Sequence, residues 1–235
     1  LAAEIRQAMA VAALRHSLLR AAAGVDKGSI RFNLLNGFVA QKLLFERDLD
    51  RKPVSMLWFR VLWPLLWQRR RLMPLVSPRG IYCFYSKELI RALADMIGGR
   101  RCVEIAAGDG TLSRFLVAAG VDVVATDDHS WSHRIAFPRE VLRQDARTAL
   151  RVHRPQVVLC SWPPAGNPFE RHVFTTGGVQ LYVVIGSRHE RGAGDWAAYR
   201  RQTEFAMEHD AALSALVLPP ELEPAVYVFR RRPTA

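Results

Sequence analysis

The pattern of apolar and polar residues changes near residue 80 of this 235-residue chain. Before that point, apolar spacing and helix propensity predict helices only, over 2–22, 31–48 and 55–71. We expect the third helix to kink at Pro64, because proline lacks the backbone N–H that a helix interior uses. The pattern therefore predicts a helical N-terminal segment over residues 1–80.

After residue 80, short β-branched runs alternate with helical segments. The runs that predict strands are 101–105, 121–126, 157–161, 179–186, 213–218 and 225–230. Helices are expected from the Ser86 cap to Ile97, closed by Gly98-Gly99, and over 111–119 and 195–209. This alternation predicts an α/β domain over 81–235 with a doubly wound, mostly parallel sheet. The last run follows Pro219-Pro220 without room for a crossover helix, so we expect an antiparallel hairpin with 213–218.

Charge adds a second feature, because the chain carries a net charge of +11 and most of its basic residues are arginines. From Arg51 to Lys87 there are eight basic residues and no acidic one. Aromatic residues are interleaved with them, at Trp58, Phe59, Trp63, Trp67 and Tyr82. The interpretation we prefer is a helix with arginines in water and tryptophans in the core. A grip on single-stranded nucleic acid and a membrane-surface element also fit this stretch.

The cysteines and the apolar stretches exclude several classes. Three widely spaced cysteines, Cys83, Cys102 and Cys160, form neither a disulfide framework nor a zinc pattern, and they fit a reducing, cytoplasmic compartment. The longest apolar stretch, 54–67, is too short to span a bilayer. Asp127, His129 and His133 have a metal-like spacing only on a helix, and the nearby Pro138 argues against one, so we expect no metal.

The strongest chemical signal lies where the first strand of the sheet meets its helix. Gly108 and Gly110 allow a sharp turn that brings a ligand against bare backbone, and the helix from Thr111 is expected to direct its amides there. Asp127 ends the next strand, 19 residues after Gly108. At this spacing a carboxylate accepts both ribose hydroxyls in nucleotide-binding sheets.

Electrostatics decides which nucleotide fits best. The third glycine of the dinucleotide fingerprint is replaced by Ser113, and Asp109 places an anion where a pyrophosphate would be repelled. S-adenosylmethionine carries a cationic sulfonium and ammonium and no phosphate, so Glu104 and Asp109 are compatible with it. A nicotinamide oxidoreductase is therefore the less favoured enzyme.

Segment 103–111, Val-Glu-Ile-Ala-Ala-Gly-Asp-Gly-Thr, resembles the first motif of class I S-adenosylmethionine-dependent methyltransferases, with Ala106 where that family often has glycine. Segments 125–127, 144–146 and 160–164 resemble the second, third and fourth motifs. The resemblance covers about residues 80–232. It implies a Rossmann-like, seven-stranded sheet with an antiparallel C-terminal hairpin, a helical lid over 1–80, and S-adenosylhomocysteine as a product. The cofactor-binding residues it implies are Glu104, Ala106, Gly108, Asp109, Gly110, Asp127, Asp128, Asp145, Ala146 and Ser161.

Two of these assignments have alternatives. Asp145, expected to meet the adenine amino group, would serve equally well as the cap of the following helix. At Asp128 the family usually has an apolar residue that covers the adenine, and Trp131 is a substitute for that role.

The acceptor side is less specific. The segment Ser161-Trp162-Pro163-Pro164 partly matches the Asx-Pro-Pro-aromatic loop of amino-methyltransferases, which orients an amine. A hydroxyl acceptor would need a general base, for which His129, His172, His189 and Glu190 are candidates. We expect Ser161, Trp162 and His189 to be catalytic, and Tyr82, Tyr85, Trp162 and Pro163 to contact the acceptor.

The sequence thus predicts methyl transfer to a nitrogen or oxygen of a small-molecule or peptidic acceptor. One alternative is a nucleic-acid methyltransferase or nucleic-acid binder that uses the basic stretch. The other is a catalytically degenerate interaction module that binds S-adenosylmethionine.

Overall fold

The structure is a computed structural model that describes residues 34–67, 69–133 and 135–233. The chain forms two compact units, Leu1–Phe84 and Tyr85–Ala235. The strand β3 (Phe84–Tyr85) contains the division between them. The predicted helix over 2–22 lies outside the described residues.

The first unit contains helices and a small pair of strands. Its elements are α2 (Leu34–Leu44), β1 (Phe45–Arg47), β2 (Asp50–Arg51), α3 (Met56–Leu62), α4 (Leu72–Val76) and 3-10 turns at Trp63–Leu65, Arg69–Arg71 and Ser77–Arg79. The prediction of helices only was wrong, because β1 and β2 pair antiparallel. The turn between them contains Asp48, whose φ of +47° no helix can accommodate. The break at Pro64 is confirmed, since α3 ends at Leu62.

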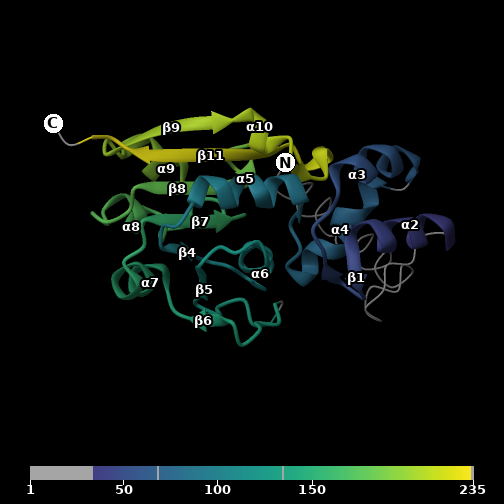
Figure 1. The fold of residues 1–235 in the computed structure, drawn as a ribbon, viewed down its shortest axis with the longest axis horizontal. Helices are drawn as coiled ribbons and strands as arrows, with labels where there is room; N and C mark the ends of the chain where they lie inside the picture. The colour runs from purple at the N-terminus through teal and green to yellow at the C-terminus, as the bar shows by residue number, and fades with distance from the viewer. Residues whose placement is uncertain (1–33, 68, 134, 234–235) are drawn as a thin grey trace, which may run out of the picture. The chain divides into compact units, whose positions relative to one another are not determined.

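The second unit is built on one seven-stranded sheet. Its strands are β4 (Cys102–Glu104), β5 (Val123–Asp127), β6 (Val141–Arg143), β7 (Val157–Ser161), β8 (Leu181–Ser187), β9 (Phe205–Asp210) and β11 (Pro224–Arg231). Their order is β6-β5-β4-β7-β8-β11-β9, as Figure 1 shows. Pairing is parallel from β6 to β8, whereas β11 is antiparallel to both β8 and β9. The predicted mostly parallel sheet with an antiparallel C-terminal strand is confirmed.

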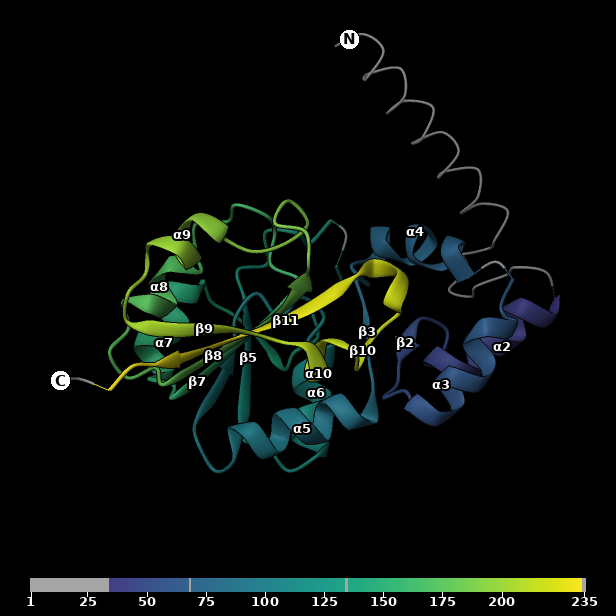
Figure 2. The same ribbon diagram turned by 90° about the horizontal axis from the view of Figure 1, so that it is seen from above.

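Helices cover both faces of this sheet. They are α5 (Lys87–Ile97), α6 (Thr111–Ala118), α7 (Ala146–His153), α8 (Arg171–Phe174), α9 (Trp196–Arg201) and α10 (Ala211–Ser214). Figure 2 shows α5, α6 and α10 on one side of the strands and α7, α8 and α9 on the other. The cap predicted for α5 is confirmed: Ser86 Oγ accepts the N–H of Leu89 at 3.0 Å, and Gly98 ends the helix with a φ of +59°.

The partner predicted for the last strand was wrong. β11 pairs with β9 over Arg231↔Phe205 to Val226↔Asp210, whereas 213–218 contains part of α10 and the short β10 (Val217–Leu218). The helix predicted over 195–209 accordingly stops at Arg201. β9 is an edge strand in which only Phe205 is buried, so its sequence lacks the apolar alternation that identifies a strand. β6 was not predicted for a similar reason, because only Val141 of its three residues is buried.

Candidate functional site

Most of the predicted site residues lie at the carboxyl ends of β4, β5 and β7. Glu104, Asp127 and Ser161 are the last residues of these strands. β4 lies between β5 and β7 in the sheet. The chain passes from β4 to β5 and β6 on one side, and the later strands of the sheet, from β7 onward, lie on the other side of β4. Ligands of open α/β sheets bind at such a switch point.

The loop after β4 bends through three residues with positive φ. They are Ala106 at +50°, Gly108 at +58° and Gly110 at +69°. A Cβ on Gly110 would lie 2.6 Å from Cγ2 of Val141, so the close approach of β6 requires glycine there. Ala106 adopts the left-handed backbone even though it stands where the resembled family often has glycine.

Asp127 is held against this loop. Its Oδ2 accepts the N–H of Gly108 at 3.0 Å and its Oδ1 accepts the N–H of His129 at 2.8 Å. Burial raises the pKa of this carboxyl above its ordinary value, and the two backbone hydrogen bonds oppose the rise. A carboxylate has about four acceptor positions, so these two bonds leave capacity for two further donors.

Two other carboxylates cap the helix that follows the loop. Oε2 of Glu104 accepts both the N–H of Ser113 at 3.0 Å and its hydroxyl at 2.5 Å, and Asp109 Oδ1 accepts the N–H of Thr111 at 3.1 Å. Glu104 is only 1% exposed. These two amides of α6, expected to point at a ligand, are therefore bonded to side chains of the chain itself. Carboxylates occupy the place where a phosphate would otherwise bind.

Asp145 and Asp128 lie at the neighbouring strand ends. Asp145 caps α7, because it accepts the N–H of Thr148 at 3.0 Å and its hydroxyl at 2.8 Å. These hydrogen bonds hold the pKa of Asp145 below its ordinary value. Ala146 is the buried first residue of that helix. Asp128 is exposed and accepts the N–H of Ser130 at 2.8 Å. The capping alternative for Asp145 is thus correct, and its contact with adenine stays a prediction.

Two residues assigned separately from the sequence meet on the acceptor side. The hydroxyls of Tyr85 and Ser161 are 2.7 Å apart. Tyr85 is 5% exposed and lies edge-on to Phe115, so its hydroxyl is fixed beside the end of β7. Tyr82 belongs to the first unit.

The loop after Ser161 has an unusual backbone. Trp162 has a φ of +53°, and its N–H donates to the carbonyl of Ile185 at 2.6 Å. Its indole Nε1 is buried and has no hydrogen-bond partner among the described residues. A non-glycine residue in this conformation persists only where its surroundings enforce it.

Two further hydrogen bonds fix the loop that follows Ser161. The carbonyl of Pro163 accepts the N–H of Gly194 at 3.0 Å, and the carbonyl of Pro164 accepts Nδ2 of Asn167 at 2.8 Å. The loops after β7 and β8 are thereby joined.

Glu170 connects these supports and was not identified from the sequence. Its side chain is fully buried, and it accepts hydrogen bonds from the Tyr182 hydroxyl, the Tyr199 hydroxyl (2.5 Å), Asn167 Nδ2 (2.6 Å) and the Asp195 N–H (2.8 Å). Burial raises its pKa above the ordinary value, against the effect of these donors. No motif marks it, although it is the only acidic residue between Asp145 and Glu190.

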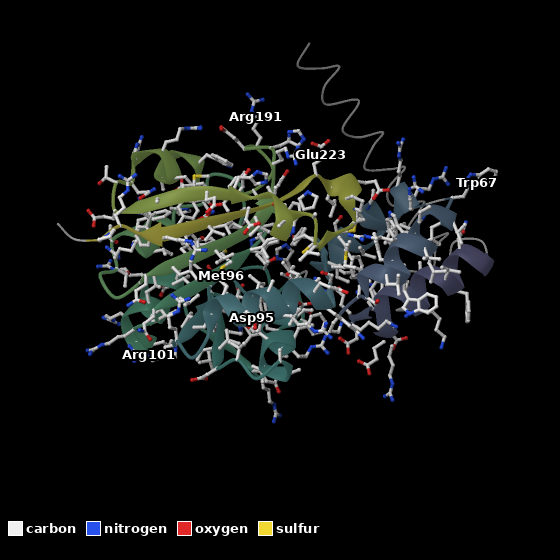
Figure 3. The ribbon with its side chains drawn as sticks, turned by 45° about the horizontal axis from the view of Figure 1, so that its top comes forward. Trp67, Asp95, Met96, Arg101, Arg191 and Glu223 are labelled. Carbon is white, nitrogen blue, oxygen red and sulfur yellow. The ribbon has the colours of Figure 1, made fainter. Side chains whose placement is uncertain are left out.

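The candidate bases lie in different environments. His189 is exposed, and its Nε2 lies 3.1 Å from Oε2 of Glu223, which is labelled in Figure 3. Glu190 is exposed and pairs with Arg200 at 2.8 Å. Burial and nearby arginines lower the pKa of His172. His129 follows Asp127 closely, stacks on Phe137 with centroids 4.0 Å apart, and has a buried Nε2 without a partner among the described residues.

Thiol, metal and membrane features do not add to the site. Burial raises the pKa of Cys102 and Cys160, which keeps both thiols protonated. Within the described residues, no group of three His, Cys, Asp or Glu side chains is placed to hold a metal ion. No helix in that part of the chain is long and apolar enough to cross a bilayer.

Neither a protein-family model nor a curated protein matches this sequence. Solved structures with a similar fold include magnesium protoporphyrin IX methyltransferase from Synechocystis PCC 6803 with bound S-adenosylmethionine, at 12% identity, covering 71% of this chain and 84% of that one, with a TM-score of 0.45. A TehB-like S-adenosylmethionine-dependent methyltransferase from Corynebacterium glutamicum is 15% identical, with 61% and 87% covered and a TM-score of 0.41.

The CurJ carbon methyltransferase is 13% identical over 57% of this chain, with a TM-score of 0.38, and this chain spans about half of its length, 49%. The fold follows from the strands themselves. With seven strands in the order given above, an antiparallel final strand and helices on both faces, the second unit has the Rossmann-like fold of class I S-adenosylmethionine-dependent methyltransferases.

Proposed function

We propose that this protein is an S-adenosylmethionine-dependent methyltransferase that acts on a nitrogen or oxygen of a small-molecule or peptidic acceptor. The observation that carries the proposal is the hydrogen bond between Asp127 and Gly108. It places a carboxylate with spare acceptor capacity directly beside the glycine turn at the end of β4. That arrangement suits a ribose lying over exposed backbone.

The charges around the turn favour this cofactor over a dinucleotide. Glu104, Asp109 and Asp127 surround the loop, and the first two already bond to amides of α6. A pyrophosphate would meet three carboxylates, whereas a cationic ligand is attracted by them. Asp127 would hold the ribose and the backbone of 106–110 would support the methionine portion, with Asp128, Asp145 and Ala146 near the adenine. Bound there, S-adenosylmethionine supplies an electrophilic methyl group on sulfur.

The acceptor would be oriented by the pair Tyr85 and Ser161. Their hydroxyls lie 2.7 Å apart at the end of β7, and a hydroxyl can both donate to and accept from a polar acceptor molecule. Trp162 adds a buried indole N–H that lacks an acceptor. Pro163 would form part of the wall, and Tyr82, a residue of the first unit, stays a predicted acceptor contact. The contribution of these groups is positioning, which in favourable cases lowers a barrier by about 7–11 kcal/mol.

A hydroxyl acceptor would also need its proton removed. His129 is our preferred base, because its Nε2 is buried without a partner among the described residues and its backbone N–H donates to Asp127, whereas His189 is exposed and paired with Glu223. His189 would take this role only if its loop closed over the acceptor. An amine acceptor would need no base during transfer if it arrived unprotonated.

Calorimetric titration with S-adenosylmethionine and S-adenosylhomocysteine tests the cofactor assignment. We expect both to bind, and Asp127→Ala to weaken binding at least about tenfold, equivalent to about 1.4 kcal/mol. Asp95→Ala is the matched control, since Asp95 is an exposed carboxylate on α5 (Figure 3). Absence of binding to the unmutated protein would refute the proposal.

Transfer of labelled methyl groups separates the alternatives. Pools of small molecules, peptides and RNA, each supplied with labelled S-adenosylmethionine, would identify the acceptor class. Labelling in the RNA pool alone would favour the nucleic-acid alternative. Cofactor binding without labelling in any pool would favour the interaction module. Native mass spectrometry of the purified protein would reveal a retained cofactor.

A further inference from the structure

The first unit exposes a row of large apolar side chains to solvent. Along α3 and the turn after it, the exposed fractions are Leu57 69%, Trp58 59%, Val61 53%, Leu65 69% and Trp67 94%. Met56, Phe59, Trp63 and Leu66 from the same segment are buried. The segment is therefore apolar on two faces, of which one packs into the unit. The expectation that its tryptophans face the core is wrong for Trp58 and Trp67.

Trp67 extends away from the ribbon of the first unit, as Figure 3 shows. Contiguous exposed apolar patches on soluble proteins commonly mark an interaction site. We name this patch, Leu57, Trp58, Val61, Leu65 and Trp67, the apolar row.

The surroundings of the apolar row are basic. Arg60 is exposed within α3, and Arg70 and Arg71 are exposed just after Trp67. No acidic residue occurs between Arg51 and Lys87. A partner of this surface must therefore accept apolar side chains and carry negative charge next to them.

We propose that the apolar row docks on an anionic lipid surface. Tryptophan is favoured at the boundary between headgroups and acyl chains, because its ring is apolar and its N–H is polar. Leu57, Val61 and Leu65 would enter the acyl layer, while the arginines would bind lipid phosphates. This arrangement uses every exposed side chain of the row.

Other occupants satisfy fewer of these features. Single-stranded nucleic acid would stack on the two tryptophans, but three of the five members of the row are aliphatic and offer no stacking surface. A second copy of the chain would bring the same basic residues against each other. Residues 1–33 carry five basic and two acidic side chains, so they do not supply the missing negative charge either.

Vesicle sedimentation with the full chain tests the proposal. Vesicles of phosphatidylcholine with phosphatidylglycerol are compared with vesicles of phosphatidylcholine alone. We expect binding to the anionic vesicles at least about tenfold tighter, because two or more arginines each contribute about fivefold near an anionic surface. Trp58→Ala combined with Trp67→Ala should weaken binding at least about tenfold, in keeping with the burial of two large rings.

Trp131→Ala is the matched control, because Trp131 is a 38% exposed tryptophan in the second unit. It should leave vesicle binding unchanged. The double variant at Trp58 and Trp67 should melt at the temperature of the unmutated protein, since the two side chains it removes are exposed. Indole emission should shift to the blue with anionic vesicles, and Trp67→Phe should reduce that shift.

Failure to bind anionic vesicles overturns the proposal, as does equal binding to neutral ones. Binding that survives removal of Trp58 and Trp67 also overturns it. A single-stranded RNA that binds through these two tryptophans, while vesicles do not, would assign the surface to nucleic acid instead. None of these outcomes depends on the proposed methyl transfer.

Discussion

The Oδ2 atom of Asp127 accepts the backbone N–H of Gly108 at 3.0 Å, across 19 residues of chain. This bond fixes the carboxylate beside the glycine turn and favours its ionised form. Burial acts in the opposite direction and is the larger effect, so the pKa of Asp127 lies above its ordinary value. Protonation of this group therefore begins at a higher pH than for an exposed aspartate.

We expect the affinity for S-adenosylhomocysteine to fall as the pH is lowered through this titration. The ionised carboxylate accepts hydrogen bonds from both ribose hydroxyls, whereas the protonated form has lost part of that capacity. Calorimetric titrations over a series of pH values measure the effect. Asp127→Asn should bind more weakly and show a flatter pH dependence. An unchanged pH profile in this variant would contradict the role of Asp127.

The same pKa shift has a defined sign for folding. A carboxyl whose pKa is raised in the folded state contributes its stability fully below the unfolded pKa. That contribution is lost as the pH rises through the folded pKa. Asp127 therefore stabilises the folded protein most at acid pH, whereas its ionised form, present at higher pH, is the form that would bind the cofactor. Such a conflict between stability and binding is typical of functional residues.

Gly110→Ala should destabilise the protein more than Gly120→Ala. Both positions have positive φ, so each substitution strains the backbone, by about 1–2 kcal/mol in the left-handed helical region. At Gly120 the new Cβ would have no atom within 4 Å. Only at Gly110 would the new Cβ meet a neighbour, Val141 Cγ2 at 2.6 Å, which adds about 1–3 kcal/mol. Urea unfolding measures both.

Val141→Ala in the Gly110→Ala background is a further test of that contact. It removes the clashing methyl group, so the two substitutions together should cost less than the sum of their separate effects. Additive costs would show that the contact does not limit the loop.

Ala106→Gly should stabilise the folded chain slightly or leave it unchanged. The substitution removes the backbone strain of a φ of +50°, which stabilises the folded state by about 1–2 kcal/mol. It also makes the unfolded chain more flexible, which destabilises the folded state by about 0.5–1 kcal/mol. Ala107→Gly, at the next residue, has no such strain to relieve and should be destabilising. Thermal melting of both variants gives the comparison. Equal destabilisation would mean that the positive φ at Ala106 carries no strain.

Local signals explain which parts of the molecule could be predicted. The turn 106–110, the acid 19 residues later and the Ser86 cap are each defined by short spacings, and all lie where expected. β9 could not be predicted, because an edge strand with a solvated surface carries no apolar alternation. The sheet, and not its sequence, determines that this segment is extended.

Long-range contacts explain the rest. Tyr85 and Ser161 were each assigned to the acceptor side, but 76 residues separate them, and no sequence spacing predicts that their hydroxyls meet. Glu170 draws its donors from 167, 182, 195 and 199, which only the packing of α8, α9 and β8 brings together. Buried polar clusters of this kind have no local signature.

Removal of the Glu170 side chain should be among the most damaging single substitutions. Glu170→Ala leaves the buried hydroxyls of Tyr182 and Tyr199 without their acceptor, at about 1–3 kcal/mol each, so we expect a loss of about 2–6 kcal/mol in the free energy of unfolding. Glu190→Ala is the control, because it breaks an exposed ion pair with Arg200 and should cost about 0.2–1 kcal/mol. Urea unfolding distinguishes the two.

Glu170→Gln is the sharper test, because it keeps the shape of the side chain and removes its titration. The amide oxygen accepts from Asn167 and the Asp195 N–H, and the tyrosine hydroxyls can rotate to accept from its nitrogen. Because burial raises the pKa of Glu170, the unmutated protein gains stability from this group as the pH falls through the folded pKa. The stability of the unmutated protein relative to Glu170→Gln should therefore increase toward acid pH. A difference that stayed constant with pH would show that Glu170 keeps an ordinary pKa.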